Sequence, residues 1–160
     1  MMHVAQLNIG RLLATTDDPQ VRDFMQNLDC VNGLGKRMPG FVWMMEGSGE
    51  PGTGNTDTKI DGDPQFVSNL TVWESVQALE TFVWGTIHKQ FYDRKAEWFA
   101  VMGVPHFVMW LIPVGHRPTL EEGLDRLAHK KTHGDSDYAF GWDYARASLH
   151  KTHACDGGAA

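Results

Sequence analysis

The sequence has little cysteine and no long apolar run. Cys30 and Cys155 are its only cysteines, one on an expected helix and one in a tail of small residues, so a disulfide framework is excluded and free thiols fit a reducing cytoplasm. No stretch reaches the roughly 18 apolar residues that a membrane-spanning helix needs. The N-terminus lacks a charged segment followed by an apolar one, as a signal peptide would have. We therefore expect a cytoplasmic protein with no membrane partner.

Positive charge is also scarce. Lys and Arg number 14 against 20 Asp and Glu, which gives a net charge of −6, and the basic residues are scattered along the chain. Proteins that bind polyanions usually carry a basic patch. No nucleic-acid partner is therefore expected.

Motifs for phosphate binding, acyl transfer and metal binding are missing as well. No glycine-rich loop leads into a Lys-Ser/Thr pair, and there is no G-x-S-x-G. His129 and His133 stand four residues apart on an expected helix, a spacing that can hold one metal ion, but no third ligand is near them in the sequence. No metal site is predicted.

Two periodicities alternate along the chain and predict its elements. Alternating polar and apolar residues indicate strands, whereas apolar residues at helical spacing indicate helices. A capping box, formed by Thr119 and Glu122, opens the last helix, and Gly85 marks a bend in the one before it. The expected strands cover residues 3–13, 41–46, 65–74 and 106–114, and the expected helices cover residues 19–38, 75–100 and a stretch that follows Thr119. Residues 46–64 are rich in Gly, Asp and Thr, and predict a long mobile surface loop.

The element order β-α-β-β-α-β predicts an α+β fold of ferredoxin-like topology. It has a four-stranded antiparallel sheet, both long helices on one face, and an extra C-terminal helix. The domain is expected to cover residues 1–146, and residues 147–160 to form a disordered tail. The second sheet face is still rich in large apolar groups. Because an uncovered face of this kind implies a partner, we expect a homodimer formed through the sheets.

Several segments, taken in order, resemble one protein family. They are "AQLNIGRLL" at the start, "PGFVW" at the second strand, "VWES…AL…FV…H" from the third strand into its helix, "EWF" at that helix's end, and "VGHRPTLEEGLDRLAHKKTHG" after the fourth strand. Together they resemble the DUF3291 family, in the dimeric α/β barrel superfamily that also holds the antibiotic biosynthesis monooxygenases. The resemblance implies a ferredoxin-like protomer that dimerises sheet to sheet. It does not imply one reaction, because that superfamily includes cofactor-free oxygenases, haem-using enzymes and non-catalytic members.

His88 is the first candidate catalytic residue. It lies four residues after Trp84, on the shoulder of the helix beside the sheet, and the family resemblance implies a histidine at this position. A neutral imidazole there could act as a general base on an acidic phenol. It could also ligate a haem iron, or it could only make a hydrogen bond at a pocket rim.

Polar residues on two strands are the second candidates. Gln6 and Asn8 lie on the first strand, and Asn69 and Thr71 on the third. If the two strands are neighbours, these side chains share a face, where Asn8 or Asn69 could stabilise a developing anion through hydrogen bonds. The alternative is a polar network that only sets the register of the strands.

Aromatic residues are the third group of candidates. The chain has six tryptophans, which is many for one small domain. We expect a planar or hydrophobic small-molecule substrate to bind among Trp43, Trp73, Trp84, Trp110 and Phe91. The alternative is that these rings fill the core and the interfaces.

Three functions remain open at this point. The first is a small-molecule enzyme resembling the cofactor-free monooxygenases, with His88 moving a proton. The second adds haem, with His88 as its axial ligand. The third is a non-catalytic ligand-binding or scaffold dimer.

Overall fold

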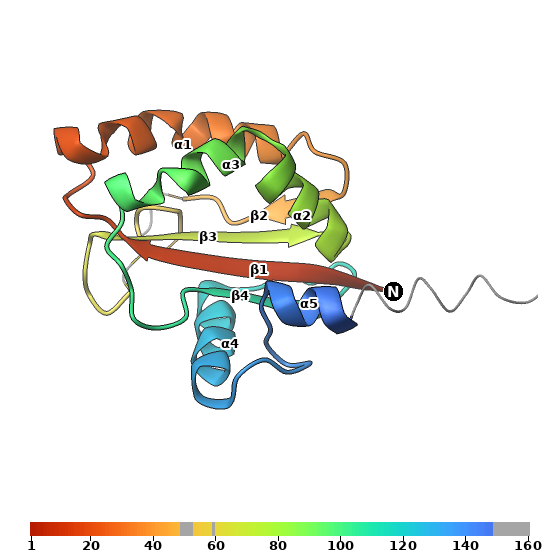
Figure 1. Cartoon of the computed structure of the whole chain (residues 1–160). Helices are drawn as coiled ribbons and strands as arrows, with labels where there is room; N and C mark the ends of the chain where they lie inside the picture. Colours follow the sequence, from red (N-terminus) through yellow and green to blue (C-terminus); the bar gives the residue numbers. More distant parts are fainter. Residues whose placement is uncertain (49–52, 59, 149–160) are drawn as a thin grey trace, which may run out of the picture.

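A four-stranded antiparallel sheet forms the centre of the protein. The computed structural model describes residues 1–48, 53–58 and 60–148. The strands are β1 (Met2–Arg11), β2 (Phe41–Met44), β3 (Phe66–Trp73) and β4 (Phe107–Pro113). Their order across the sheet is β2-β3-β1-β4, and every neighbouring pair is antiparallel (Figure 1). This is the ferredoxin-like topology, so the predicted fold class is confirmed.

Three helices lie on the upper face of this sheet in Figure 1. They are α1 (Arg22–Gly35), α2 (Val76–Gly85) and α3 (Ile87–Asp93). Single 3-10 turns precede α1, at Pro19–Val21, and follow α3, at Lys95–Glu97. Asp18 caps the first turn, because its carboxylate accepts the Gln20 N–H at 2.8 Å.

The helix expected over residues 75–100 is broken, and this part of the prediction is wrong. Thr86 has an extended backbone with φ −129° and ψ −175°, so it ends α2 and caps α3. Its hydroxyl accepts the His88 N–H at 3.2 Å and donates to the Phe82 carbonyl at 2.7 Å. The bend predicted at Gly85 is therefore a complete break one residue later, stabilised by a threonine that bonds on both sides of it.

The register assigns each side chain to one of two sheet faces. Ala5 pairs with Val72 on β3 and with Trp110 on β4, whereas Gln6 pairs with Thr71 and Met109. Since residues directly opposite each other project to the same side, the two sets lie on opposite faces. The upper face, below α1–α3, carries the row that contains Gln6, and the lower face carries the row that contains Ala5.

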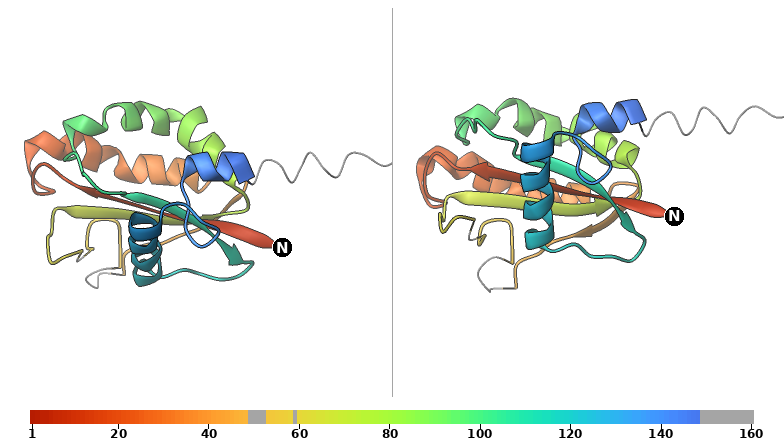
Figure 2. Two further views of the ribbon diagram at one scale, coloured as in Figure 1. Left: turned by 60° about the horizontal axis from the view of Figure 1, so that its bottom comes forward. Right: turned by 90° about the horizontal axis from the view of Figure 1, so that it is seen from below.

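The lower face is covered by the chain's own last long helix, α4 (Leu120–His133) (Figure 2). Leu120, Leu124 and Leu127 pack against the core of that face. Leu7 and Trp110, which project from this side of the sheet, are completely buried within the single chain. The expectation that this face lies open is therefore wrong, because an amphipathic helix that follows the fourth strand folds back beneath the sheet.

The uncovered sheet face was the reason to expect a homodimer, and α4 covers that face. Sheet-to-sheet association would have to displace α4, and re-exposing three leucines costs about 1.5–3 kcal/mol for each one. A homodimer stays a prediction, and it needs another surface.

The chain after α4 returns to the upper layer around the outer edge of β4. Met109 and Phe140 exchange two backbone hydrogen bonds, at 2.7 Å and 2.9 Å. The short helix α5 (Trp142–Ser148) follows and packs beside α2 through Ala145. The edge of β4 is therefore paired at this point, which limits strand addition there. The domain end expected at residue 146 falls inside α5, and the expected disordered tail lies otherwise outside the described residues.

The described part of the 46–64 loop is bonded to β3. Ser68 donates its N–H to the Asn55 carbonyl at 2.8 Å and accepts the Asn55 side-chain amide at 2.9 Å. The Thr58 hydroxyl donates to the Phe66 carbonyl at 3.0 Å, and Ile60 is buried in the lower core. The described part of the segment is therefore held against the sheet, whereas a long mobile surface loop was expected.

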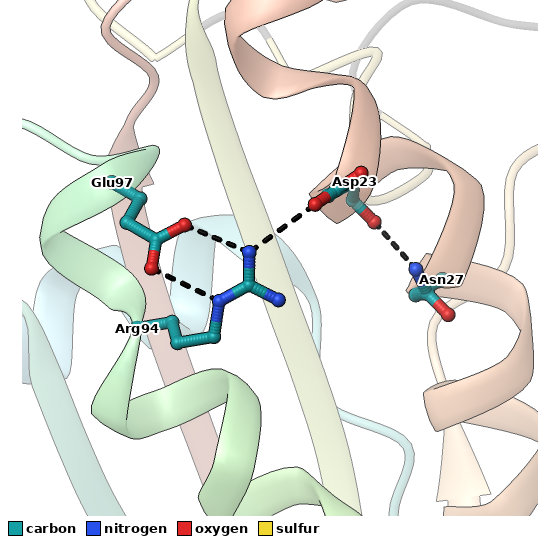
Figure 3. A network of polar contacts seen from close by, with 4 residues as sticks. All are labelled: Asp23, Asn27, Arg94 and Glu97. Carbon is teal, nitrogen blue, oxygen red and sulfur yellow. Dashed lines mark hydrogen bonds and ion pairs between the residues drawn. The ribbon is translucent and has the colours of Figure 1, made fainter.

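A charged network joins the end of α3 to α1 (Figure 3). The Arg94 guanidinium donates to both carboxylate oxygens of Glu97, at 3.0 and 2.8 Å, and to Asp23 at 3.2 Å. Hydrogen bonds from Arg94 lower the pKa of the Glu97 carboxyl. The network connects the end of α3 to α1 and so helps to position the two helices. All three side chains are exposed, so we expect it to contribute little to the free energy of unfolding.

The close packing of α4 gives the first prediction. A Cβ at Gly123 would lie 2.9 Å from Leu7 Cδ2 and 3.3 Å from Trp110, whereas a Cβ at Gly33 in α1 would meet nothing within 4 Å. Gly33→Ala should raise the free energy of unfolding by about 0.5–1 kcal/mol through helix propensity. Gly123→Ala should lower it by about 1–3 kcal/mol through overpacking. Urea denaturation of the two variants measures both, and an equal gain at both positions would show that α4 does not pack closely on the sheet.

Candidate functional site

A buried polar network lies on the upper face of the two central strands. Gln6 on β1 is 5% exposed, and its amide nitrogen donates to Asn69 Oδ1 at 2.7 Å and to Thr71 Oγ1 at 2.9 Å. The Thr71 oxygen also accepts the indole N–H of Trp73 at 2.9 Å. The expectation that these polar residues share a face is therefore confirmed, and at Gln6 and Thr71 they form a closed, structural network.

The open part of this polar row is the pair Asn8 and Asn69. They are direct cross-strand partners, so both project to the upper face. Asn8 is exposed although β1 has strands on both sides, which means that the helical layer does not cover it. Among the described residues, no hydrogen bond involves the Asn8 carboxamide or the Asn69 side-chain nitrogen. Two amide groups are thus available to a ligand beside each other on the sheet.

His88 lies at the start of α3 with a defined tautomer. Its Nδ1 is 3.3 Å from the Val83 carbonyl, which can only accept, so Nδ1 carries the proton of the neutral ring. Nε2 then holds the free electron pair. Burial lowers the pKa of His88 below its usual 6.5, and the bond to Val83 opposes that shift only in part. The ring packs against Phe82, with centroids 5.0 Å apart. His88 is therefore a neutral base at physiological pH.

An aromatic groove of about 410 Å³ is lined by residues of α2, α3, β4, α4 and α5. We call it the aromatic groove, because four of its walls are Trp84, Tyr92, Phe107 and Trp142. Phe107 and Trp142 are stacked, with centroids 5.4 Å apart and planes 10° apart. Trp84 and Tyr92 meet edge to face at 4.9 Å. The polar walls are His106, Lys130, Asp135, Asp143 and Arg146.

Trp84 has an unpartnered hydrogen-bond donor in this groove. Its indole Nε1 is buried and has no acceptor among the described residues. A buried donor without a partner costs about 1–3 kcal/mol, and most such groups in proteins are paired. Because this nitrogen is covered by protein atoms, an acceptor on a bound molecule could reach it only after a shift of the indole.

The aromatic groove and the open amides are neighbours on the sheet. Phe107 of β4 is the direct cross-strand partner of Asn8, which places its ring on the same side as the Asn8 carboxamide. Apolar walls beside a few unpaired polar groups are the usual composition of a small-molecule site.

The other aromatic residues expected to bind substrate are placed elsewhere. Trp110 lies on the lower face, where its indole donates to Glu122 at 2.9 Å, and Trp43 packs in the same lower core. Trp73 is buried beneath α2, stacked on Phe82 at 5.3 Å, and Phe91 packs in a separate cluster with Trp98. The prediction of one pocket lined by all of them is wrong, because the sheet separates Trp43 and Trp110 from the others and Phe91 packs in a different cluster from Trp73 and Trp84. Of these rings, Trp84 alone lines one of the two grooves described.

Several groove residues were not predicted. Tyr92 follows Trp84 by eight residues, which is two steps of the i, i+4 spacing that places side chains on one face of a helix. The sequence could therefore have indicated Tyr92. His106 and Phe107 open a strand that had been identified. Trp142 and Arg146 had no such signal, because they reach the groove only through the return of the chain around β4.

A second groove, of about 440 Å³, lies between α1 and the segment that follows β2. Its walls are mostly polar, and it contains none of the expected site residues. Within the described ranges, no group of three or more His, Cys, Asp or Glu side chains is placed to hold a metal ion. Within the same ranges, no helix combines the length and the apolar character needed to cross a membrane.

The model of a domain of unknown function, DUF3291, matches residues 3–155. The chain belongs to the DUF3291 family. The resemblance drawn from the sequence segments is thereby confirmed.

Two solved structures have a similar course of the chain. A protein of unknown function from Nitrosomonas europaea aligns with a TM-score of 0.48 and 11% identity, over 74% of this chain and 97% of that one. A second protein from the same organism, provisionally named an antibiotic biosynthesis monooxygenase, aligns with a TM-score of 0.45 and 16% identity, over 74% and 93%. At this level of similarity neither likeness says anything about activity. No curated protein sequence matches this DUF3291 chain.

The buried network gives the second prediction. Thr71→Val keeps the side-chain volume but leaves the Trp73 N–H without an acceptor, which should lower the free energy of unfolding by about 1–3 kcal/mol. Thr71→Ser keeps the acceptor and loses one methyl group, worth about 0.8 kcal/mol. Chemical denaturation should therefore rank the serine variant above the valine variant, and the opposite order would show that apolar packing, not the hydrogen bond, matters at this position.

Proposed function

We propose that this DUF3291 protein is a small-molecule enzyme resembling the cofactor-free monooxygenases. The observation that carries the proposal is the pair of unpaired amide nitrogens of Asn8 and Asn69, which lie on the same sheet face as the groove residue Phe107 without lining the groove themselves. A planar or hydrophobic substrate would lie against the groove rings, and the two carboxamides would donate hydrogen bonds to an anion formed on it. Of the residues predicted for the site, the proposal therefore retains Asn8, Asn69 and Trp84.

In this proposal His88 removes the proton that starts the reaction. Its Nε2 holds the free electron pair, and its lowered pKa keeps it unprotonated at working pH. For a planar phenol with a free ring position, the base takes the hydroxyl proton and the electron-rich ring then reduces O₂. One oxygen atom replaces the ring hydrogen as a carbonyl, and the other leaves as water. The phenol supplies every electron, so no external reductant is needed.

The residues present do not fit a haem. The bond from His88 Nδ1 to a carbonyl is common in metal-ligating histidines, but His88 lines neither of the two described grooves. Neither of these two grooves therefore places room for a porphyrin beside its free nitrogen. We derive no step through haem.

The same observation favours a second candidate function, a ligand-binding protein without catalysis. His88 is not a wall of the aromatic groove, so a molecule could bind there without meeting the base. In the enzymatic proposal the proton passes from the substrate to His88 directly or through one water molecule. The two functions share the groove and differ only in the role of His88.

The role of His88 gives the third prediction. Turnover of a planar phenol such as 1-naphthol, followed as oxygen uptake, should fall at least about 100-fold in His88→Ala. His133→Ala changes an exposed histidine on α4 and serves as the matched control. An unchanged rate in His88→Ala would remove the catalytic role and leave the ligand-binding function.

The pH profile tests the same residue independently. Because burial lowers the pKa of His88, the base form persists to a more acidic pH than in an ordinary histidine. The rate should therefore rise with pH, with its midpoint below pH 6.5. A midpoint above that value would contradict the buried, neutral state of the ring.

A further inference from the structure

We infer that the aromatic groove is a binding site for an aromatic carboxylate. The ring would lie among its four aromatic walls, and the carboxylate near Lys130, which lines the groove, and Lys95, which lies over the ring of Tyr92. The inference rests on the proposed function in that it names a substrate class for the same site. It holds equally if the protein binds its ligand without catalysis.

The size and walls of the groove suit one or two fused rings. Its volume of about 410 Å³ falls in the lower part of the range for small-molecule sites, roughly 300–1,000 Å³. Its four rings form one cluster with both stacked and edge-to-face contacts: Phe107 stacks on Trp142, and Trp84 meets Tyr92 and Trp142 edge to face. Aromatic ligands make both kinds of contact.

The Trp84 N–H could bond an acceptor on the ligand if the indole shifts on binding. Trp84 lines the groove, its Nε1 is covered by protein atoms, and no described side chain or backbone oxygen accepts from it. An indole can only donate, so its ligand partner is an oxygen or an unprotonated nitrogen. A carboxylate oxygen is the stronger acceptor because it is charged.

Lys95, a cation beside the groove without a carboxylate partner among the described residues, favours an anion over a neutral acceptor. It lies over the Tyr92 ring with its Nζ 4.0 Å from the centroid. Lys130 lines the groove, and its nearest carboxylate, Asp135, is 3.6 Å away. Arg146 lines it too and pairs with Glu80 at 2.8 Å.

The formal charges near the groove balance, because three carboxylates, Asp135, Asp143 and Glu80, stand against three cations, Lys95, Lys130 and Arg146. Lys130 is paired with Asp135, which also accepts the Gly141 N–H at 3.2 Å. Two of the cations act on His106: its pKa is lowered first by burial and then by the charge of Lys95, with a smaller effect of Lys130. The preference for an anion therefore rests on the position of Lys95 near His106, not on the net charge of the groove.

The fourth prediction is a binding experiment on the full chain by isothermal titration calorimetry. We expect 2-naphthoate to bind at one site, and to bind at least about tenfold tighter than 2-naphthamide, which has the same shape and no charge. Cyclohexanecarboxylate, which keeps the charge and lacks the aromatic ring, should bind more weakly as well. Equal affinity for naphthoate and naphthamide would overturn the inference.

Three variants locate the site. Trp84→Phe removes the indole N–H, and Lys95→Met removes the unpaired charge; each should weaken naphthoate binding about fivefold or more. Lys131→Met changes the exposed neighbour of Lys130 and should leave the affinity within about twofold. Unlike Lys95, Lys131 neither lies over a ring of the groove nor shifts the pKa of His106. Lys95 is exposed, so its variant remains informative even if Trp84→Phe does not fold. Unchanged binding in Lys95→Met would place the anion elsewhere and overturn the inference.

The His88→Ala variant separates this inference from the proposed function. It should bind naphthoate as the parent protein does, because His88 is not a wall of the groove. Saturable naphthoate binding without turnover of any phenol would contradict the enzymatic proposal alone. Turnover of phenols by a protein that does not bind naphthoate would contradict this inference alone.

Discussion

The two-sided burial of β1 is the constraint on which the rest of the structure depends. The strand is hydrogen-bonded to β3 on one side and to β4 on the other, so its side chains can only enter the layer above or the layer below. The lower layer accepts Ala5, Leu7 and Ile9 and is mostly apolar, with Ser68, opposite Ile9, as a buried polar residue. The upper layer must accept Gln6 and Asn8. The amide nitrogen of Gln6 is paired, whereas Asn8 stays open to solvent, and the candidate site begins where this pairing stops.

Much of the fold was predictable because local periodicity carries it. The alternation in β1, the order of the elements and the capping of α4 by Thr119 were all readable, and the Thr119 hydroxyl does accept the Glu122 N–H at 3.1 Å. The sheet face against which α4 packs could not be predicted. An apolar stripe shows that a helix must be buried, but not against which sheet face. The break at Thr86 was missed because its two hydrogen bonds replace the helical ones locally, and threonine has no strong helix-breaking signature.

The candidate site was predictable only in its strand residues. Gln6, Asn8, Asn69 and Thr71 share a face because the alternation within each strand and the antiparallel pairing of β1 with β3 require it. The indoles could not be sorted in the same way. Whether Trp110 lies above or below the sheet depends on its pairing with Ala5, and no short-range pattern sets that register. The groove itself needs α5, which arrives from the far end of the chain.

The position of α5 near the end of the described chain determines when, during synthesis, the protein becomes able to bind a ligand. Trp84 and Tyr92 are made midway through synthesis, whereas Trp142 and Arg146 are among the last described residues to be added. A nascent chain that has already emerged as far as β4 has all four strands of its sheet, but only one side of the groove. Ligand recognition is thus confined to the finished polypeptide, and a bound molecule would in turn hold the C-terminal helix in place.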